Sequence, residues 1–158
     1  QSRRSLRDWV LTGRTIALWG LSFKPNTDDM HEAASRTLIE AIWAASGEVK
    51  AFDPQAMEAC KAICASRDDM HYCATIEEAL NSADCLVICT EWKAFWAPNF
   101  EDIKKKLITP LIIDGRNLHN PEDVEAAGIE YFGIGRGRSV TRTCTTRLVR
   151  LLHRGLQV

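Results

Sequence analysis

A regular alternation of short apolar runs with longer amphipathic segments constrains the fold of this chain most. The apolar runs, predicted to be strands, are residues 15–23, 49–53, 71–74, 85–90, 111–114 and 130–134. The predicted helices between them are residues 32–46, 55–65, 75–82, 100–107 and 121–127. Such alternation requires parallel strands joined by right-handed crossovers. The sequence therefore predicts an α/β fold with a three-layer, doubly wound (Rossmann-like) parallel sheet of about six strands in the order 3-2-1-4-5-6.

Local signals mark several helix ends. Thr75 and Glu78 have the spacing of a capping box. Asn120 suits the N-cap position, and Pro121 suits the first position of the helix that follows. Gly47 follows the first predicted helix, as expected of a residue that adopts a positive φ. These signals predict element boundaries independently of the apolar pattern.

The length of 158 residues fits one domain with appendages. Residues 15–136 hold all the predicted strands and are expected to form that domain. Residues 1–14 are interpreted as a lead-in from a missing upstream region, because the chain starts at Gln1 rather than Met. Residues 137–158 are expected to form a basic C-terminal extension, mostly helical. Since residues 136–158 hold six Arg and no acid, nucleic-acid binding is the alternative to packing on the domain or on a second copy.

Composition excludes several classes of protein. Apolar residues make up 46% of the chain, which favours a packed core over disorder. No run approaches the ~20 apolar residues of a membrane-spanning helix, so we expect a cytoplasmic protein without membrane contacts. The six cysteines form no CxxC pair, and no His lies at a metal-ligand spacing from them. They are interpreted as reduced structural thiols, and no metal site is expected.

Polar residues are concentrated where the first predicted strand meets the first helix. They are Lys24, Asn26, Thr27, Asp28, Asp29, His31 and Glu32. In open α/β sheets, ligands bind at such junctions. Gly20 does not begin a GxGxxG fingerprint, so Lys24, rather than glycine backbone, is expected to face a phosphate. The alternative is an exposed loop lysine.

Other strand ends carry polar groups to the same edge. Asp53 ends the second strand, where an acid either holds a ribose hydroxyl or forms an Asp-Pro turn, and the turn is favoured. The Asp114-Gly115 turn places Arg116 at the rim, where its planar fork suits phosphate or a sugar hydroxyl, unless it pairs with an acid. Residues 90–92 end the fourth strand. Since no nucleophile beside a base is recognisable, the residues alone indicate a binding domain.

One long signature and four shorter motifs that follow it in order resemble one family. GLSFKPNTDDMHEAAS is similar to the GLxFKxxTxDxRxSxS-type signature in the C-terminal, UDP-binding domain of the UDP-glucose/GDP-mannose dehydrogenase family. AFDP, CTEWKAF, IIDGRN and YFGIGR follow in the order of that family. The resemblance covers residues 13–136, and FKPNTDDM most resembles the bacterial UDP-glucose 6-dehydrogenases.

The resemblance implies a role in nucleotide-sugar metabolism and polysaccharide biosynthesis. The family converts UDP-glucose to UDP-glucuronate while reducing two NAD. An N-terminal domain binds most of the NAD and a central region holds the catalytic Cys; both are expected to be absent here. This chain is thus expected to be inactive alone and to hold no catalytic residue. Phe23, Lys24 and Arg116 match the substrate-binding residues, and the full-length enzyme is expected to be a homo-oligomer.

One position departs from the family pattern. His31 stands where the family has an Arg that approaches the NAD, so His31 is the candidate cofactor-binding residue. Two alternatives stay open. The same domain could serve a GDP-mannose or UDP-N-acetylmannosamine dehydrogenase. The chain could instead be a free-standing nucleotide-binding or interaction module whose Arg-rich tail docks on a partner.

Overall fold

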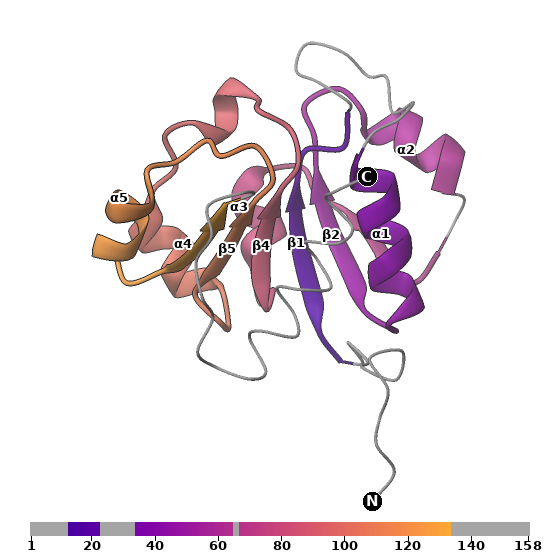
Figure 1. The fold of residues 1–158 in the computed structure, drawn as a ribbon. Coiled ribbons are helices and arrows are strands. Elements are labelled where there is room, and N and C mark those ends of the chain that lie inside the picture. Colours follow the sequence, from indigo (N-terminus) through magenta and orange to yellow (C-terminus); the bar gives the residue numbers. More distant parts are fainter. Residues whose placement is uncertain (1–12, 23–33, 65–66, 134–158) are drawn as a thin grey trace, which may run out of the picture.

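The computed structural model describes residues 13–22, 34–64 and 67–133. Within them, six parallel strands form one sheet in the order β3-β2-β1-β4-β5-β6 (Figure 1). The strands are β1 (Thr15–Trp19), β2 (Glu48–Phe52), β3 (Met70–Tyr72), β4 (Cys85–Ile88), β5 (Leu111–Asp114) and β6 (Glu130–Gly133). The helices are α1 (Ala34–Ala44), α2 (Met57–Cys64), α3 (Ile76–Leu80), the 3-10 turn η2 (Lys93–Phe95), α4 (Phe100–Lys106) and α5 (Pro121–Ala126). The predicted fold class and strand order are confirmed.

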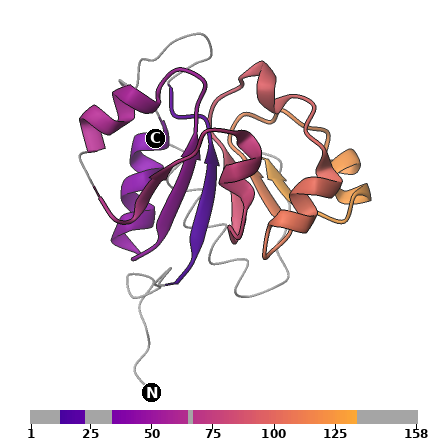
Figure 2. The ribbon, with the colours of Figure 1, turned by 180° about the vertical axis from the view of Figure 1, so that it is seen from behind.

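Helices cover both faces of the sheet. Successive residues of β1 point to opposite faces, so Ile16 and Leu18 pack into the core beneath α1 and α2, while Trp19 packs into the core on the other side. That second core holds the buried residues of α3, α4 and α5. Figure 1 shows α1 in front of the sheet, and Figure 2, from behind, shows α3 and α4 in front. Both faces are therefore buried, which explains the uniformly apolar strands.

The first strand is shorter than predicted. It was expected to extend to residue 23 but ends at Trp19, because Gly20 adopts a φ of 98° and turns the chain out of the sheet. The turn η2 was not predicted. Phe23, Lys24 and His31 lie outside the described residues, as do residues 1–12 of the predicted lead-in and the whole predicted basic extension.

The two predicted N-caps are present, whereas the positive φ expected of Gly47 after the first helix falls on Ser46, at 66°. Thr75 Oγ1 accepts from Glu78 N at 3.0 Å, and Asn120 accepts from Glu122 N at 2.9 Å. The Glu78 carboxylate accepts from Ala74 N rather than from the N-cap amide, so the reciprocal bond of the capping box falls one residue earlier than in the standard motif.

Five of the six cysteines lie among the described residues, and none of these five forms a disulfide. Cys60, Cys64, Cys73, Cys85 and Cys89 are all free thiols, and all except Cys64 are buried. Burial raises the pKa of Cys85, as expected of a thiol that fills core space. In the described part of the chain, no helix has the length and apolar character that crossing a bilayer requires.

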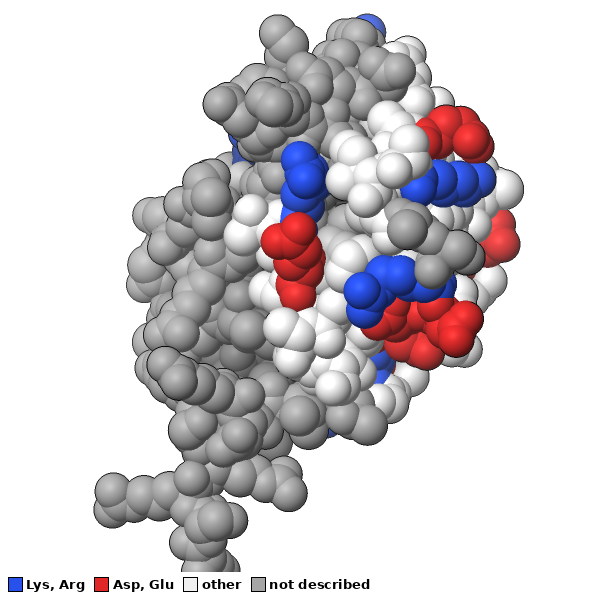
Figure 3. All heavy atoms as spheres, turned by 90° about the vertical axis from the view of Figure 1, so that its right-hand side faces the viewer, with Lys and Arg blue, Asp and Glu red and all other residues white. Residues whose placement is uncertain are grey.

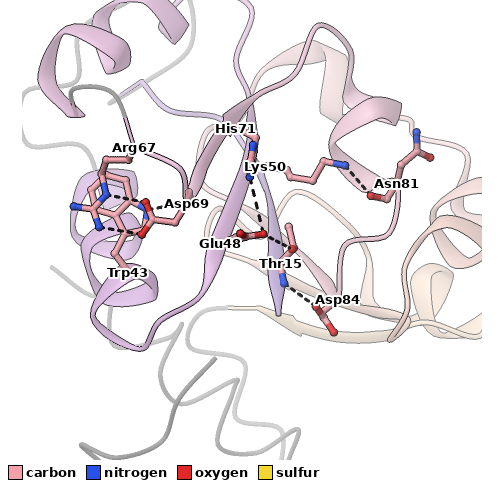
Figure 4. A network of polar contacts seen from close by, with 9 residues as sticks. All are labelled: Thr15, Trp43, Glu48, Lys50, Arg67, Asp69, His71, Asn81 and Asp84. Carbon is pink, nitrogen blue, oxygen red and sulfur yellow. Dashed lines mark hydrogen bonds and ion pairs between the residues drawn. The ribbon is translucent and has the colours of Figure 1, made fainter. Parts of the chain in front are cut away.

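The amino edge of the sheet is closed by polar contacts among its own residues (Figure 4). Thr15 N donates to Asp84 at 2.7 Å, and Arg67 pairs with Asp69 at 2.8 Å while its guanidinium lies 4.0 Å from the Trp43 ring. In the side view of Figure 3, basic and acidic side chains of the described surface lie next to one another. Charges at this edge are therefore matched internally, which suits a structural role.

Replacing Gly20 with Ala is expected to destabilise the domain more than replacing Gly13. Both glycines have positive φ, 98° and 78°, so alanine strains the backbone by roughly 1–2 kcal/mol at either position. A Cβ at Gly20 would also lie 2.6 Å from the Thr90 side chain and 2.7 Å from its backbone nitrogen, whereas nothing lies within 4 Å at Gly13. Urea unfolding should give a loss of about 3 kcal/mol or more for Gly20→Ala. Equal losses for the two variants would contradict this packing.

Candidate functional site

The carboxyl ends of the neighbouring strands β2, β1, β4 and β5 lie at one edge of the sheet, at the top of Figure 1. The segments that leave them are residues 20–22 after β1, Asp53 after β2, residues 89–92 after β4 and residues 115–116 after β5. Because all the strands are parallel, these segments meet at one edge, where open α/β sheets bind ligands. The predicted site residue Arg116 lies there, and the chain leading to Phe23 and Lys24 starts there.

Asp53 lies at the centre of this edge and is completely buried. Its Oδ2 accepts from Leu21 N, Ser22 N, Ser22 Oγ and Trp92 Nε1, and its Oδ1 accepts from Gln55 N and Ala56 N, all at 2.8–3.3 Å. A carboxylate can remain in a dry interior only when hydrogen-bond donors replace its water. Donors from three strand ends do so here.

The hydrogen bonds of Asp53 decide between the two roles that the sequence allows, ribose binding and an Asp-Pro turn. Both carboxylate oxygens are directed at groups of the chain itself, two donors on Oδ1 and four on Oδ2. The turn role is therefore supported over ribose binding. The sequence predicted the local Asp-Pro turn but not the bonds to β1 and β4, because these come from residues 31 to 39 positions away.

The carbonyls of the same β1 extension are held as well. Thr90 Oγ1 donates to Ser22 O at 2.8 Å, and Ser35 Oγ donates to Leu21 O at 2.6 Å. Ser22, Ser35 and Thr90 are all buried. Leu21 and Ser22 therefore have both their N–H and C=O groups bonded, and they are the two residues directly before Phe23.

Arg116 is exposed at the rim, on a turn organised by Asp114. Asp114 Oδ1 accepts from Arg116 N at 2.9 Å, while Oδ2 accepts from Leu118 N at 2.7 Å and from the Tyr131 hydroxyl at 2.6 Å. The Arg116 side chain donates from Nε to Cys89 O at 3.1 Å. The predicted Asp114-Gly115 turn thus places the guanidinium beside the end of β4.

Two titratable groups below Arg116 are shifted toward their neutral forms. Burial raises the pKa of the Cys89 thiol to about 12, although the nearby Arg116 acts in the opposite direction. Burial also lowers the pKa of His119, which is packed edge-on against Phe100 and Tyr131. At neutral pH the Cys89 thiol and the His119 ring are therefore uncharged.

Sequence reasoning missed Thr90 and Trp92 as organisers of the site. Both were noted only as the polar end of the fourth strand, and no spacing in the sequence signals a bond to Asp53 or Ser22. Among the described residues, no group of three or more His, Cys, Asp or Glu side chains could hold a metal ion.

The doubly wound sheet, with its bonded carboxyl edge and exposed Arg, defines a Rossmann-like nucleotide-binding class of domain. The sequence model of the UDP-glucose/GDP-mannose dehydrogenase family, UDP binding domain, matches residues 17–121. The chain belongs to this family.

Several relatives are dehydrogenases. The chain is 43% identical over 132 residues to a UDP-glucose 6-dehydrogenase of Pseudomonas aeruginosa, covering 80% of this chain and 29% of that protein. It is 42% identical over 129 residues to UDP-glucose 6-dehydrogenase YwqF of Bacillus subtilis, covering 80% and 28%. The chain thus spans less than a third of the length of these relatives.

Solved structures agree. A UDP-glucose dehydrogenase from Pyrobaculum islandicum superposes with a TM-score of 0.63 at 27% identity, over 81% of this chain and 27% of that one. A UDP-D-ManNAc dehydrogenase from Pyrococcus horikoshii gives 0.63 at 29% identity, over 83% and 27%.

The stability of the domain is expected to fall as the pH drops below the ordinary His pKa of 6.5, with His119 as a cause. The unfolded chain binds a proton near that pH, whereas burial lowers the pKa of His119 in the folded state, and the Asp114 carboxylate only partly offsets this. The stabilising contribution is therefore complete above 6.5 and is lost as the pH falls toward the folded pKa.

A His119→Phe variant provides the test, because it keeps an aromatic ring and cannot titrate. Thermal unfolding midpoints measured between about pH 7.5 and 5 should fall less steeply in the variant than in the wild type. Parallel profiles would show that His119 does not cause the loss.

Proposed function

We propose that this chain is the UDP-sugar-binding domain of an NAD-dependent UDP-glucose 6-dehydrogenase, a longer enzyme that converts UDP-glucose to UDP-glucuronate. The observation that carries the proposal is the 43% identity to such an enzyme over 29% of its length. The position of Arg116 at the carboxyl edge supports it. On this proposal the chain alone is inactive.

The proposed substrate contacts are Phe23, Lys24 and Arg116. UDP carries a diphosphate whose negative charge requires cations or N–H donors. The Arg116 guanidinium supplies a planar set of donors at the rim, and Lys24 supplies a point charge from the turn that follows Leu21 and Ser22. Phe23 contributes apolar contact beside them. Together these side chains would bind the nucleotide rather than transform the sugar.

The chemistry is proposed to take place on groups outside this chain. Oxidation of the sugar alcohol needs NAD as hydride acceptor, and the family uses a Cys nucleophile in its central region. A thiol reacts as its thiolate. Burial raises the pKa of both Cys60 and Cys89 to about 12, so neither is suited to that role. His31 is proposed to lie toward the NAD, which an N-terminal domain would bind.

A second candidate keeps the fold and changes the sugar nucleotide. The similarity to a UDP-D-ManNAc dehydrogenase structure favours this reading, and a GDP-mannose enzyme belongs to the same family. Parallel titration of the full-length protein with UDP-glucose, UDP-N-acetylmannosamine and GDP-mannose separates the three. We further propose a cytoplasmic homo-oligomer without membrane or nucleic-acid partners. A free-standing binding module would instead show no NADH formation with any sugar nucleotide.

Removing either proposed phosphate contact should weaken UDP-glucose binding. In the full-length protein, Arg116→Ala and Lys24→Ala are each expected to raise the KM for UDP-glucose roughly tenfold or more, the usual worth of one charged hydrogen bond. Steady-state NADH formation and calorimetric titration with UDP provide the measurements.

The matched control is Lys105→Ala, which removes an exposed cation from α4. It should leave both quantities unchanged. A wild-type protein that binds no UDP would reject the proposed function. Unchanged KM values for Arg116→Ala and Lys24→Ala would reject these residue roles.

Restoring the family Arg at position 31 is expected to lower the KM for NAD. The substitution replaces an imidazole by a permanently charged guanidinium, which suits the cofactor phosphates. The gain should be roughly three- to tenfold, in line with one added charge-assisted contact near the surface. If His31 contributes as imidazolium, wild-type NAD affinity should also fall as the pH rises through about 6.5. A flat pH profile together with no gain from His31→Arg would indicate a structural role.

A further inference from the structure

Arg116 and the end of the β1 extension, Ser22, are both bonded to one short segment, residues 89–92 at the end of β4. Arg116 Nε donates to the carbonyl of Cys89, the first residue of the segment, at 3.1 Å. Thr90 Oγ1 donates to Ser22 O at 2.8 Å, one residue before Phe23. The last residue of the segment, Trp92, donates from Nε1 to Asp53 at 3.0 Å.

The bonds that Thr90 and Trp92 make are shielded from water. Ser22, Asp53 and Thr90 are each 0–2% exposed, and Trp92 is 7% exposed. Water therefore does not compete for the bonds, and breaking one leaves a buried polar group without its partner. Gly20 adds a steric constraint, because its backbone lies so close to Thr90 that no Cβ fits between them.

We propose that Thr90, together with Trp92 and Asp53, acts as a positioning device that sets Leu21 and Ser22, the residues directly before Phe23, relative to Arg116. This inference rests on the proposed function, because Leu21 and Ser22 directly precede the proposed UDP contacts Phe23 and Lys24 in the sequence. None of the three residues touches the nucleotide. They act by holding Leu21 and Ser22 from one side while the same segment holds Arg116 from the other.

The amino ends of β1 and β4 provide an internal comparison, because a hydrogen bond joins the two strands there as well. Asp84, directly before β4, accepts from the first residue of β1, Thr15, at 2.7 Å. That bond also joins β1 to β4 and is also shielded, since Asp84 is 7% exposed. It lies at the amino edge, however, far from Arg116. Loss of this bond should affect stability alone, whereas loss of the Thr90 bond should affect stability and UDP binding.

The test compares Thr90→Val with Thr90→Ser in the full-length protein. Valine keeps the volume and removes the hydroxyl, whereas serine keeps the hydroxyl. Thr90→Val should raise the Kd for UDP and the KM for UDP-glucose roughly five- to tenfold, the effect of one buried hydrogen bond, with kcat nearly unchanged. Thr90→Ser should retain near wild-type affinity. Trp92→Phe, which removes the N–H bonded to Asp53 together with part of the buried ring, should act in the same direction as Thr90→Val.

Asp84→Ala is the matched stability control. It should lower the melting temperature and leave the Kd for UDP unchanged. Equal affinities of Thr90→Val and Thr90→Ser would overturn the positioning role, as would an equal rise in Kd for Asp84→Ala at the same loss of stability. Failure of the wild type to bind UDP would reject the proposed function itself and this inference with it, so the two failures are distinguishable.

Discussion

The carboxyl edge of this domain depends on one buried anion, the carboxylate of Asp53. An ion of this kind is expensive to remove from water unless several donors surround it. Here the donors come from the ends of β1, β2 and β4, so the chain must bring all three together before the charge is satisfied. This requirement fixes where β1 ends and how the segment toward Phe23 leaves the sheet.

The two edges of the sheet use polar groups differently. At the amino edge, opposite charges pair with each other, as in Arg67 with Asp69, and the strands are joined without a ligand. At the carboxyl edge, side chains bind backbone groups of neighbouring strand ends, and the Arg116 guanidinium is left at the exposed rim. Backbone bonding therefore builds a rigid support there.

This division fits a domain that binds and orients a nucleotide sugar for chemistry performed elsewhere in a longer protein. Rigidity matters for such a domain because catalysis depends on the substrate position to within a fraction of an ångström. The thiols of the domain are consistent with that role, since burial keeps Cys85 and Cys89 protonated within the core. Their contribution is packing volume between the strands and helices.

The sequence by itself determined the parallel sheet, its strand order, two helix N-caps and the edge at which Arg116 would lie. These follow from periodicity, turn residues and the handedness of crossovers, which depend on residues close together in the chain. Only the tertiary structure decided the long-range bonds of Asp53, Thr90 and Trp92. The partners in these bonds lie 31 to 68 positions away, and no local pattern records a hydrogen bond between strand ends. Such bonds exist because folding removes these groups from water together.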